Sequence, residues 1–186
     1  MASRKTKTKS FKSEWIYKEA ATISHPAISN PQFHRCLIDF SFLVVQEGGT
    51  PNPFSEEKTI SVDCLEVTAA QNEKRPPRKT MDAAFVIEHL RKTVRQTVLV
   101  EFKFRVRNVE NLRKQEIEDK VKNSKMLLGN EPPVLHRYFF IFKEGIKHQA
   151  INRISRIFKK PYNELEYEVT DLPALFETFF KITEGG

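Results

Sequence analysis

The chain has 186 residues, 39% of them hydrophobic and 15 of them Phe, which is enough apolar material for one domain of ordinary size. Lys and Arg number 31 against 24 Asp and Glu, so the net charge is +7 and the pI is about 9.4. A balance this basic favours a polyanionic partner such as nucleic acid. A soluble basic protein without such a partner explains the same composition equally well.

Apolar segments and cysteines argue against a membrane or secreted protein. No apolar run is long enough to span a bilayer, and the N-terminus lacks the apolar core of a secretory signal. The two cysteines, Cys36 and Cys64, are too few and too unpatterned to predict a disulfide framework or a zinc site, which favours a reducing compartment. We therefore expect an intracellular, cytoplasmic protein with no membrane partner.

The beginning of the chain is polar and basic. Met1–Lys12 is expected to form a flexible tail, either an electrostatic arm for phosphate or a solubilising end. The remaining residues, 13–186, are expected to form a single domain. Its first element is a predicted short helix over Ser13–Ala21, with Ser13 as N-cap. Gln32–Gln46 has helical spacing in its first half and strand character in its second, and the sequence leaves open which dominates.

Period-two alternation, or a short apolar run between turn residues, predicts five further strands. These strands cover Thr59–Val67, Met81–Ile87, Val98–Val106, His136–Lys143 and Glu164–Val169. Helical spacing predicts three helices, which cover Val109–Leu128, Gly145–Lys160 and Leu172–Ile182. Because strands stand on both sides of a long crossover helix, we expect a mixed α/β sheet with helices packed against it.

The strand Val98–Val106 alternates without a break. Its apolar residues fall on one face, and the other face carries Leu99, Glu101, Lys103 and Arg105. Glu101 and Lys103 are therefore expected to point the same way, as an acid and a base on the front of an apolar strand. Such a pair is either a solvated ion pair or part of a metal and phosphate site.

A second acid, Asp82, opens the preceding predicted strand, 19 residues before Glu101. If the two strands pair, both carboxylates meet at one end of the sheet with Lys103 beside them. Two carboxylates suit a hard cation such as Mg²⁺ or Mn²⁺, which would polarise a phosphoryl oxygen and lower the pKa of a bound water. Lys103 would orient that water or stabilise negative charge in the transition state. The set predicts hydrolysis of a phosphodiester.

Met81-Asp82 followed by Glu101-Phe102-Lys103 resembles the motif of the PD-(D/E)xK nuclease superfamily. The order of predicted elements matches that family over about residues 10–143, as a helix, strands, a helix and a strand. Met81 departs from the pattern, because the family often has Pro at that position. The resemblance implies a restriction-endonuclease-like, three-layer α/β fold with a mixed central sheet flanked by helices.

The resemblance also implies roles for individual residues. Asp82 and Glu101 would hold the metal together with the backbone carbonyl of Phe102. Lys103 would be the catalytic lysine. Many members add an acid from an early helix or strand, and the candidates, with Glu19 preferred, are Glu14, Glu19, Asp39 and Asp63. Some members place a polar residue on the helix after the motif, where Gln115 is the nearest candidate.

Acid-x-Lys triplets are weak signals, and this chain has two more of them. Glu56-Glu57-Lys58 is expected in a loop and Glu118-Asp119-Lys120 in mid-helix, so neither is expected to act. Contacts to nucleic acid are expected from basic side chains in the loop before Asp82, after the motif, and along one stripe of a helix. These basic residues are Arg75, Arg78, Lys79, Arg105, Arg153, Arg156 and Lys160.

The sequence therefore predicts a divalent-metal-dependent nuclease, an endonuclease acting on DNA rather than RNA, with Mg²⁺ or Mn²⁺ as cofactor. By the resemblance it would work as a homodimer or within a larger nucleoprotein complex. Three alternatives stay open. They are a non-catalytic nucleic-acid-binding subunit with a nuclease-like fold, a protein-interaction domain, and a surface ion pair on an unrelated sheet.

Overall fold

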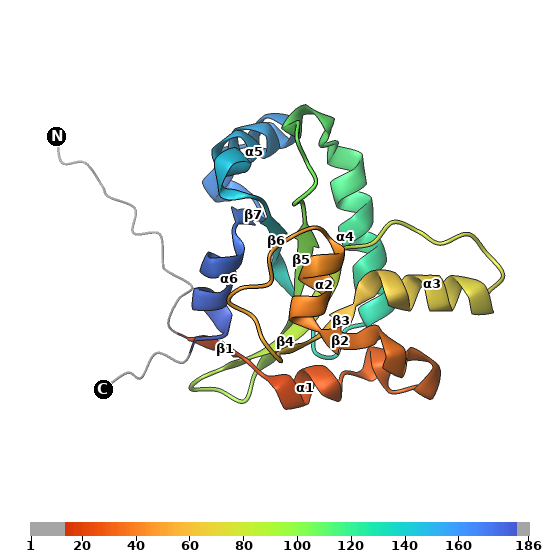
Figure 1. Ribbon diagram of the computed structural model, residues 1–186. Helices are drawn as coiled ribbons and strands as arrows, with labels where there is room; N and C mark the ends of the chain where they lie inside the picture. Colours follow the sequence, from red (N-terminus) through yellow and green to blue (C-terminus); the bar gives the residue numbers. More distant parts are fainter. Residues whose placement is uncertain (1–13, 182–186) are drawn as a thin grey trace.

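The computed structural model describes residues 14–181, which form one mixed β-sheet with helices packed on it (Figure 1). Its strands are β1 (Trp15–Tyr17), β2 (Leu37–Asp39), β3 (Lys58–Ser61), β4 (Ala83–His89), β5 (Arg95–Phe102), β6 (Val134–Ile141) and β7 (Tyr167–Thr170). They stand in the order β2-β3-β4-β5-β6-β7, and β1 pairs with the end of β4. The pairs from β2 to β5 are antiparallel, whereas β5, β6 and β7 are parallel.

Helices connect most of these strands. The α-helices of the described residues are α1 (Glu19–Ile23), α2 (Phe40–Gln46), α3 (Val62–Asn72), α4 (Lys114–Leu128), α5 (Glu144–Phe158) and α6 (Leu172–Phe179). Short 3₁₀ segments cover Pro26–Ile28, Pro31–Cys36, Val109–Asn111 and Tyr162–Glu164. The crossover from β5 to the parallel strand β6 runs through α4, as the sequence predicts.

The sheet divides the apolar core into two layers. On one face, Leu99 of β5 belongs to the same cluster as Ile117 of α4, and side chains of α3 and α5 complete this layer. On the other face, Val98 and Val100 lie in a cluster with side chains of α2 and α6. In Figure 1, α2 is drawn in front of β5, while α3 and α4 lie to the right. The expected mixed α/β sheet flanked by helices is confirmed.

The predicted strand Thr59–Val67 is wrong beyond Ser61. The hydroxyl of Ser61 accepts a hydrogen bond from the amide of Cys64 at 3.3 Å, which caps the first turn of α3. Val62 and Leu65 then enter the core at helical spacing. The alternation of polarity in this segment was an incidental match to period two, and the N-cap was the stronger local signal.

Two earlier segments also differ from expectation. Within the predicted helix Ser13–Ala21, Trp15–Tyr17 is a strand instead, because its backbone pairs with β4, and α1 begins only at Glu19. In Gln32–Gln46 the second half is helical, and extended structure is confined to β2. The tail Met1–Lys12 and the proposed N-cap Ser13 lie outside the described residues. The remaining predicted strands and helices are confirmed, with ends shifted by a few residues.

The strand that carries Glu101 is shorter and more deeply buried than expected. β5 ends at Phe102, and the chain then turns, with the amide of Val106 donating to the carbonyl of Lys103 at 3.3 Å. Along the expected charged front, exposure increases from Glu101 to Arg105, which is exposed. Leu99 and Glu101 on that face are both buried, with 0% and 1% exposure. Glu101 is therefore an interior charge, which needs a specific reason to be there.

Cys36 and Cys64 form a disulfide with a Cα–Cα distance of 5.4 Å. The bond ties the 3₁₀ segment Pro31–Cys36 to α3, at a sequence separation of 28. The sequence did not predict this bond, because the fold brings together two positions that no local pattern relates. The inference of a reducing compartment from cysteine usage loses its basis. Within residues 14–181, no helix is both long and apolar enough to cross a bilayer.

Candidate active site

Asp82 and Glu101 lie side by side on neighbouring strands. In the antiparallel pair of β4 and β5, Ala83 stands opposite Val100, and the amide of Asp82 donates to the carbonyl of Val100 at 3.1 Å. Asp82 directly precedes β4, and the Glu101 carboxylate is close enough for its charge to act on the Asp82 carboxyl. Both residues are buried, Asp82 being 6% exposed. The expected pairing of the two strands is confirmed, and it brings the two carboxylates together.

Two lysines share one oxygen of Glu101. Lys103, just past the end of β5, and Lys120 of α4 each place Nζ 2.5 Å from Glu101 Oε1. The lysine side chains are 16% and 15% exposed. The other oxygen, Oε2, is buried and has no hydrogen-bond partner among the described residues. Because an unpaired buried carboxylate oxygen is unfavourable, this atom is open to a hydrogen-bond donor, a water or a cation.

Asp82 is held by the backbone of β5. Its Oδ2 accepts a hydrogen bond from the amide of Phe102 at 2.5 Å. Burial raises the pKa of Asp82 well above its ordinary value, and the neighbouring Glu101 carboxylate raises it further. The charge of Lys120 and the Phe102 amide offset only part of this rise. The Asp82 carboxyl therefore resists ionisation unless further positive charge balances it.

Two more carboxylates act on this pair. Asp63, in the first turn of α3, is exposed as a residue, but its carboxylate accepts a hydrogen bond from the hydroxyl of the buried residue Thr80. Glu47 follows α2 and is half-buried. Burial raises the pKa of Asp63 and of Glu47, and Glu101 acts in the same direction on each. Both groups are thus within electrostatic reach of the Glu101 carboxylate.

We call this set the acid–lysine cluster. Its carboxylates are Glu47, Asp63, Asp82 and Glu101, and its ammonium groups are Lys103 and Lys120. Burial acts to lower the pKa of Lys120, but the surrounding carboxylates outweigh burial and the pKa is raised. Carboxylates outnumber ammonium groups in the cluster, so a divalent cation could balance the remaining negative charge.

The oxygen donors of the acid–lysine cluster fit Mg²⁺ or Mn²⁺. Residues 14–181 contain no group of three or more His, Cys, Asp or Glu side chains placed to hold one ion. Mg²⁺ does not require such a group, because one or two carboxylates suffice when water and substrate phosphate fill the other positions. Asp82 and the unpartnered Oε2 of Glu101 supply two donors. The backbone carbonyl of Phe102 stays a prediction as the third.

Glu19 and Gln115, two candidates from the sequence, lie elsewhere. Glu19 is exposed at the start of α1, where its charge acts on Tyr17 and Lys58. Gln115 is exposed on α4 and donates a hydrogen bond to Asp119 at 2.9 Å. Neither side chain has a described contact with the acid–lysine cluster.

The sequence did not predict the position of Lys120. It belongs to a triplet that was expected to be idle, yet Lys120 contacts Glu101 directly. A signal was present in the helix. Lys120 stands three residues after Ile117 and four before Ser124, both buried, so helical spacing places it at the inward face. Asp63 was one of four acidic candidates, and Glu47 was not considered.

Several basic residues expected to contact nucleic acid are engaged within the protein. Arg75 forms ion pairs with two acids, and Lys79 pairs with an acid of α4 at 3.4 Å. Arg153 and Arg156 both pair with Glu110, at 2.8 and 3.3 Å. The other expected contacts form no ion pair within the described part of the chain; they are Arg78, Arg105 and Lys160.

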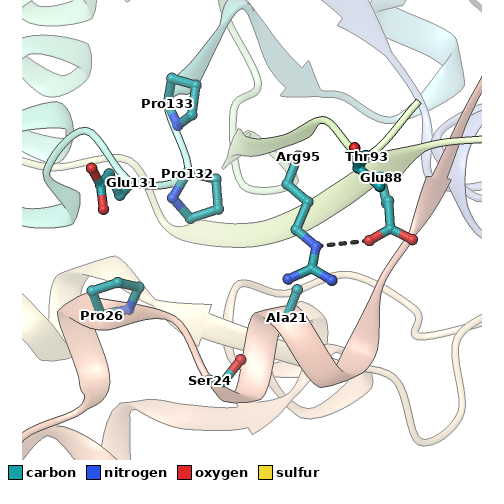
Figure 2. A pocket seen from close by; sticks show the side chains of 9 residues that line it. All are labelled: Ala21, Ser24, Pro26, Glu88, Thr93, Arg95, Glu131, Pro132 and Pro133. Atoms are coloured by element: carbon teal, nitrogen blue, oxygen red, sulfur yellow. Dashed lines mark hydrogen bonds and ion pairs between the residues drawn. The ribbon is translucent and has the colours of Figure 1, made fainter.

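A cavity of about 450 Å³ lies at the end of β4 and β5 that is farther from the acid–lysine cluster (Figure 2). Its wall includes Glu88 and Arg95, which pair with each other at 2.7 Å, and the rings of Pro132 and Pro133. The charges of this pair balance, and both side chains reach solvent. The cavity is a weaker candidate for chemistry than the acid–lysine cluster.

Comparison of the chain with protein-family models, with curated proteins and with solved structures finds no match. Function is therefore argued from the geometry and charge of the site.

Proposed function

We propose that this chain is a divalent-metal-dependent nuclease with a restriction-endonuclease-like fold. The observation that carries the proposal is the pair of neighbouring, buried acids Asp82 and Glu101, with Oε2 of Glu101 unpartnered among the described residues. A structural ion pair would need no second buried acid, since two buried carboxylates side by side repel each other. The net charge of +7 supports nucleic acid as the polyanionic substrate.

Each residue of the site has a distinct task in this proposal. Asp82 and Oε2 of Glu101 would hold Mg²⁺ or Mn²⁺ with the backbone carbonyl of Phe102. When bound, the cation polarises a phosphoryl oxygen and lowers the pKa of a bound water. Lys103 would leave Glu101 and donate a hydrogen bond where negative charge develops on the phosphoryl group. Lys120 would stay on Oε1 and keep the Glu101 carboxylate oriented.

The order of elements supports the finer fold assignment. Asp82 precedes β4, Glu101 lies in β5, and the crossover helix α4 leads to the parallel strand β6. This is the order that the resemblance implies for the nuclease core. α3, between β3 and β4, would be an addition to that core. We further propose that the enzyme is intracellular, cuts DNA internally, and works as a homodimer or in a nucleoprotein complex.

A specific observation favours a second candidate function. Both Lys103 and Lys120 already pair with Glu101, so two cations occupy one of its oxygens. A subunit that binds nucleic acid through a nuclease-like fold without cutting it would keep such ion pairs as structure. This candidate requires binding without hydrolysis.

The two functions separate in a cleavage assay on single- and double-stranded DNA and RNA with Mg²⁺, Mn²⁺ or EDTA. The nuclease proposal expects metal-dependent cleavage that falls about 1,000-fold in Lys103→Ala and in Asp82→Asn, because each change removes a group that acts on the transition state. Glu88→Gln, on the same strand as Asp82, is the matched control and should cleave normally. If no substrate is cut, the nuclease proposal is wrong. Salt-dependent binding would then support the second candidate.

A further inference from the structure

A basic cavity lies next to the acid–lysine cluster. Its volume is about 780 Å³, and it opens where the chain leaves β5 and β6, beside the loop that follows α2. The residues that line it are Gly48, Phe104, Arg105, Val106, Arg107, Lys143, Gly145 and Ile146. In open α/β sheets, ligands bind outside the carboxyl ends of parallel strands, and this cavity occupies that position for β5 and β6.

Two glycines fix the wall of this cavity. Gly48 has a φ of +86°, and a Cβ there would lie 3.1 Å from Nε of Arg105. A Cβ on Gly49 would lie 2.6 Å from the ring of Phe104, which leaves no room for it. Because both positions lack a side chain, the loop after α2 lies flush against the segment after β5. The Arg105 guanidinium also donates to the carbonyl of Gln46 at 2.5 Å, which orients it.

The cavity carries three cationic side chains, Arg105, Arg107 and Lys143. None of them forms an ion pair within residues 14–181, in contrast to Arg75 and Arg153. The charge of Arg105 acts on Glu47 of the acid–lysine cluster, where it partly offsets the effect of burial on the pKa of Glu47. The three cationic side chains therefore line a space large enough for an anion.

Two acids lie in an adjoining cavity of about 610 Å³. Glu144 and Asp171 line this cavity, which shares Gly48, Phe104 and Lys143 with the basic one. Asp171 is already paired with Lys147 at 2.7 Å. Neither acid lines the basic cavity itself.

We propose that the basic cavity binds a phosphate of the nucleic-acid backbone adjacent to the phosphodiester that is cut. This inference rests on the proposed function, since it assigns a second contact to the same substrate. Arg105 is two residues beyond Lys103, which spans at most about 7 Å of extended chain. Successive nucleotides of one strand rise about 3.4 Å each, so a phosphate in the cavity belongs within a few nucleotides of Lys103.

The test is the paired substitution Arg107→Gln with Lys143→Gln, which removes two charges from the cavity and leaves the acid–lysine cluster intact. The matched control is Arg91→Gln with Lys92→Gln, two exposed charges in the turn between β4 and β5 at the other end of the sheet. Binding of a fluorescent DNA duplex is measured by anisotropy with Ca²⁺, over a series of salt concentrations. Urea unfolding of each variant shows that the fold is kept.

The cavity pair should bind DNA roughly ten-fold more weakly, and the slope of log Kd against log salt should fall by about 1, as for one lost phosphate contact. The control pair should change the affinity less than about two-fold. Equal affinity of the two paired variants overturns the cavity proposal, even if the wild type cuts DNA. If the wild type binds but never cuts while the cavity pair weakens binding, the nuclease proposal fails, and the cavity is a phosphate contact of a subunit that binds nucleic acid without cutting it.

Discussion

An acid lies at each end of the paired strands β4 and β5, and its neighbours decide what each acid is for. Glu88 of β4 stands opposite Arg95 of β5, and the two form an ion pair. Asp82, one residue before β4, lies beside another acid, Glu101, inside the protein. Hydrogen bonding to Arg95 lowers the pKa of Glu88, whereas burial raises the pKa of Asp82. The ion pair of Glu88 and Arg95 stabilises one end of the strand pair. At the other end, Asp82 and Glu101 repel each other, which is unfavourable for stability and therefore indicates a functional role.

The largest difference between the two ends should appear in catalysis. Glu101→Gln keeps the size of the side chain but removes the charge that would hold the cation, so metal-dependent cleavage should fall about 1,000-fold or more. Glu88→Gln should leave the rate within about two-fold. Initial rates on a labelled DNA duplex with Mn²⁺ measure both. Equal losses in the two variants would mean that both act through the fold rather than through the site.

The next difference concerns stability. Lys120→Met leaves the buried Glu101 with one ammonium instead of two, and breaking a buried ion pair destabilises a protein by about 3 kcal/mol. Arg95→Met, at the exposed pair, should lower the free energy of unfolding by less than about 1 kcal/mol. Urea denaturation gives both values. A Lys120→Met protein as stable as the wild type would show that Lys120 is not needed to balance Glu101.

The smallest difference is in the pH dependence of unfolding. The folded pKa of Asp82 lies above its unfolded value near 3.8, so the folded state binds more protons and this group lowers stability as pH rises through that range. Asp82→Asn should therefore gain stability relative to the wild type at pH 8, and the gain should shrink towards pH 4. The folded pKa of Glu88 is lowered, so Glu88→Gln should lose stability at pH 8 and match the wild type in acid. The same sign for both variants would refute this account of the two acids.

Part of the site was predictable because its signals are local. The apolar residues of β5 alternate around Glu101, and Asp82 opens the preceding strand across a short connection, so the sequence identifies both acids and their pairing. The burial of Glu101 was not predictable in the same way. The alternation of apolar and polar residues distinguishes the two faces of a strand, but it does not show whether helices cover both faces. In this fold, helices cover both faces of β5.

The remaining parts of the site depend on tertiary structure. Lys120 reaches Glu101 only because α4 starts at Lys114 and lies across β5, which no spacing within the helix specifies. Asp63 reaches the cluster because the Ser61 cap turns a seemingly alternating segment into a helix. The same limit applies to the basic residues. Whether an Arg is free for phosphate depends on acids that the fold places beside it, as for Arg75.

The most direct test of the central claim is whether Asp82 and Glu101 hold one divalent cation. Mn²⁺ would be titrated calorimetrically into the wild type, Glu101→Gln, Asp82→Asn and Glu88→Gln, each with a phosphorothioate DNA oligonucleotide that resists hydrolysis. The account predicts saturable binding in the wild type and in Glu88→Gln, and affinity at least about ten-fold lower in the other two variants. Mn²⁺ binding that is unchanged by Glu101→Gln and Asp82→Asn, or absent from the wild type, would contradict it.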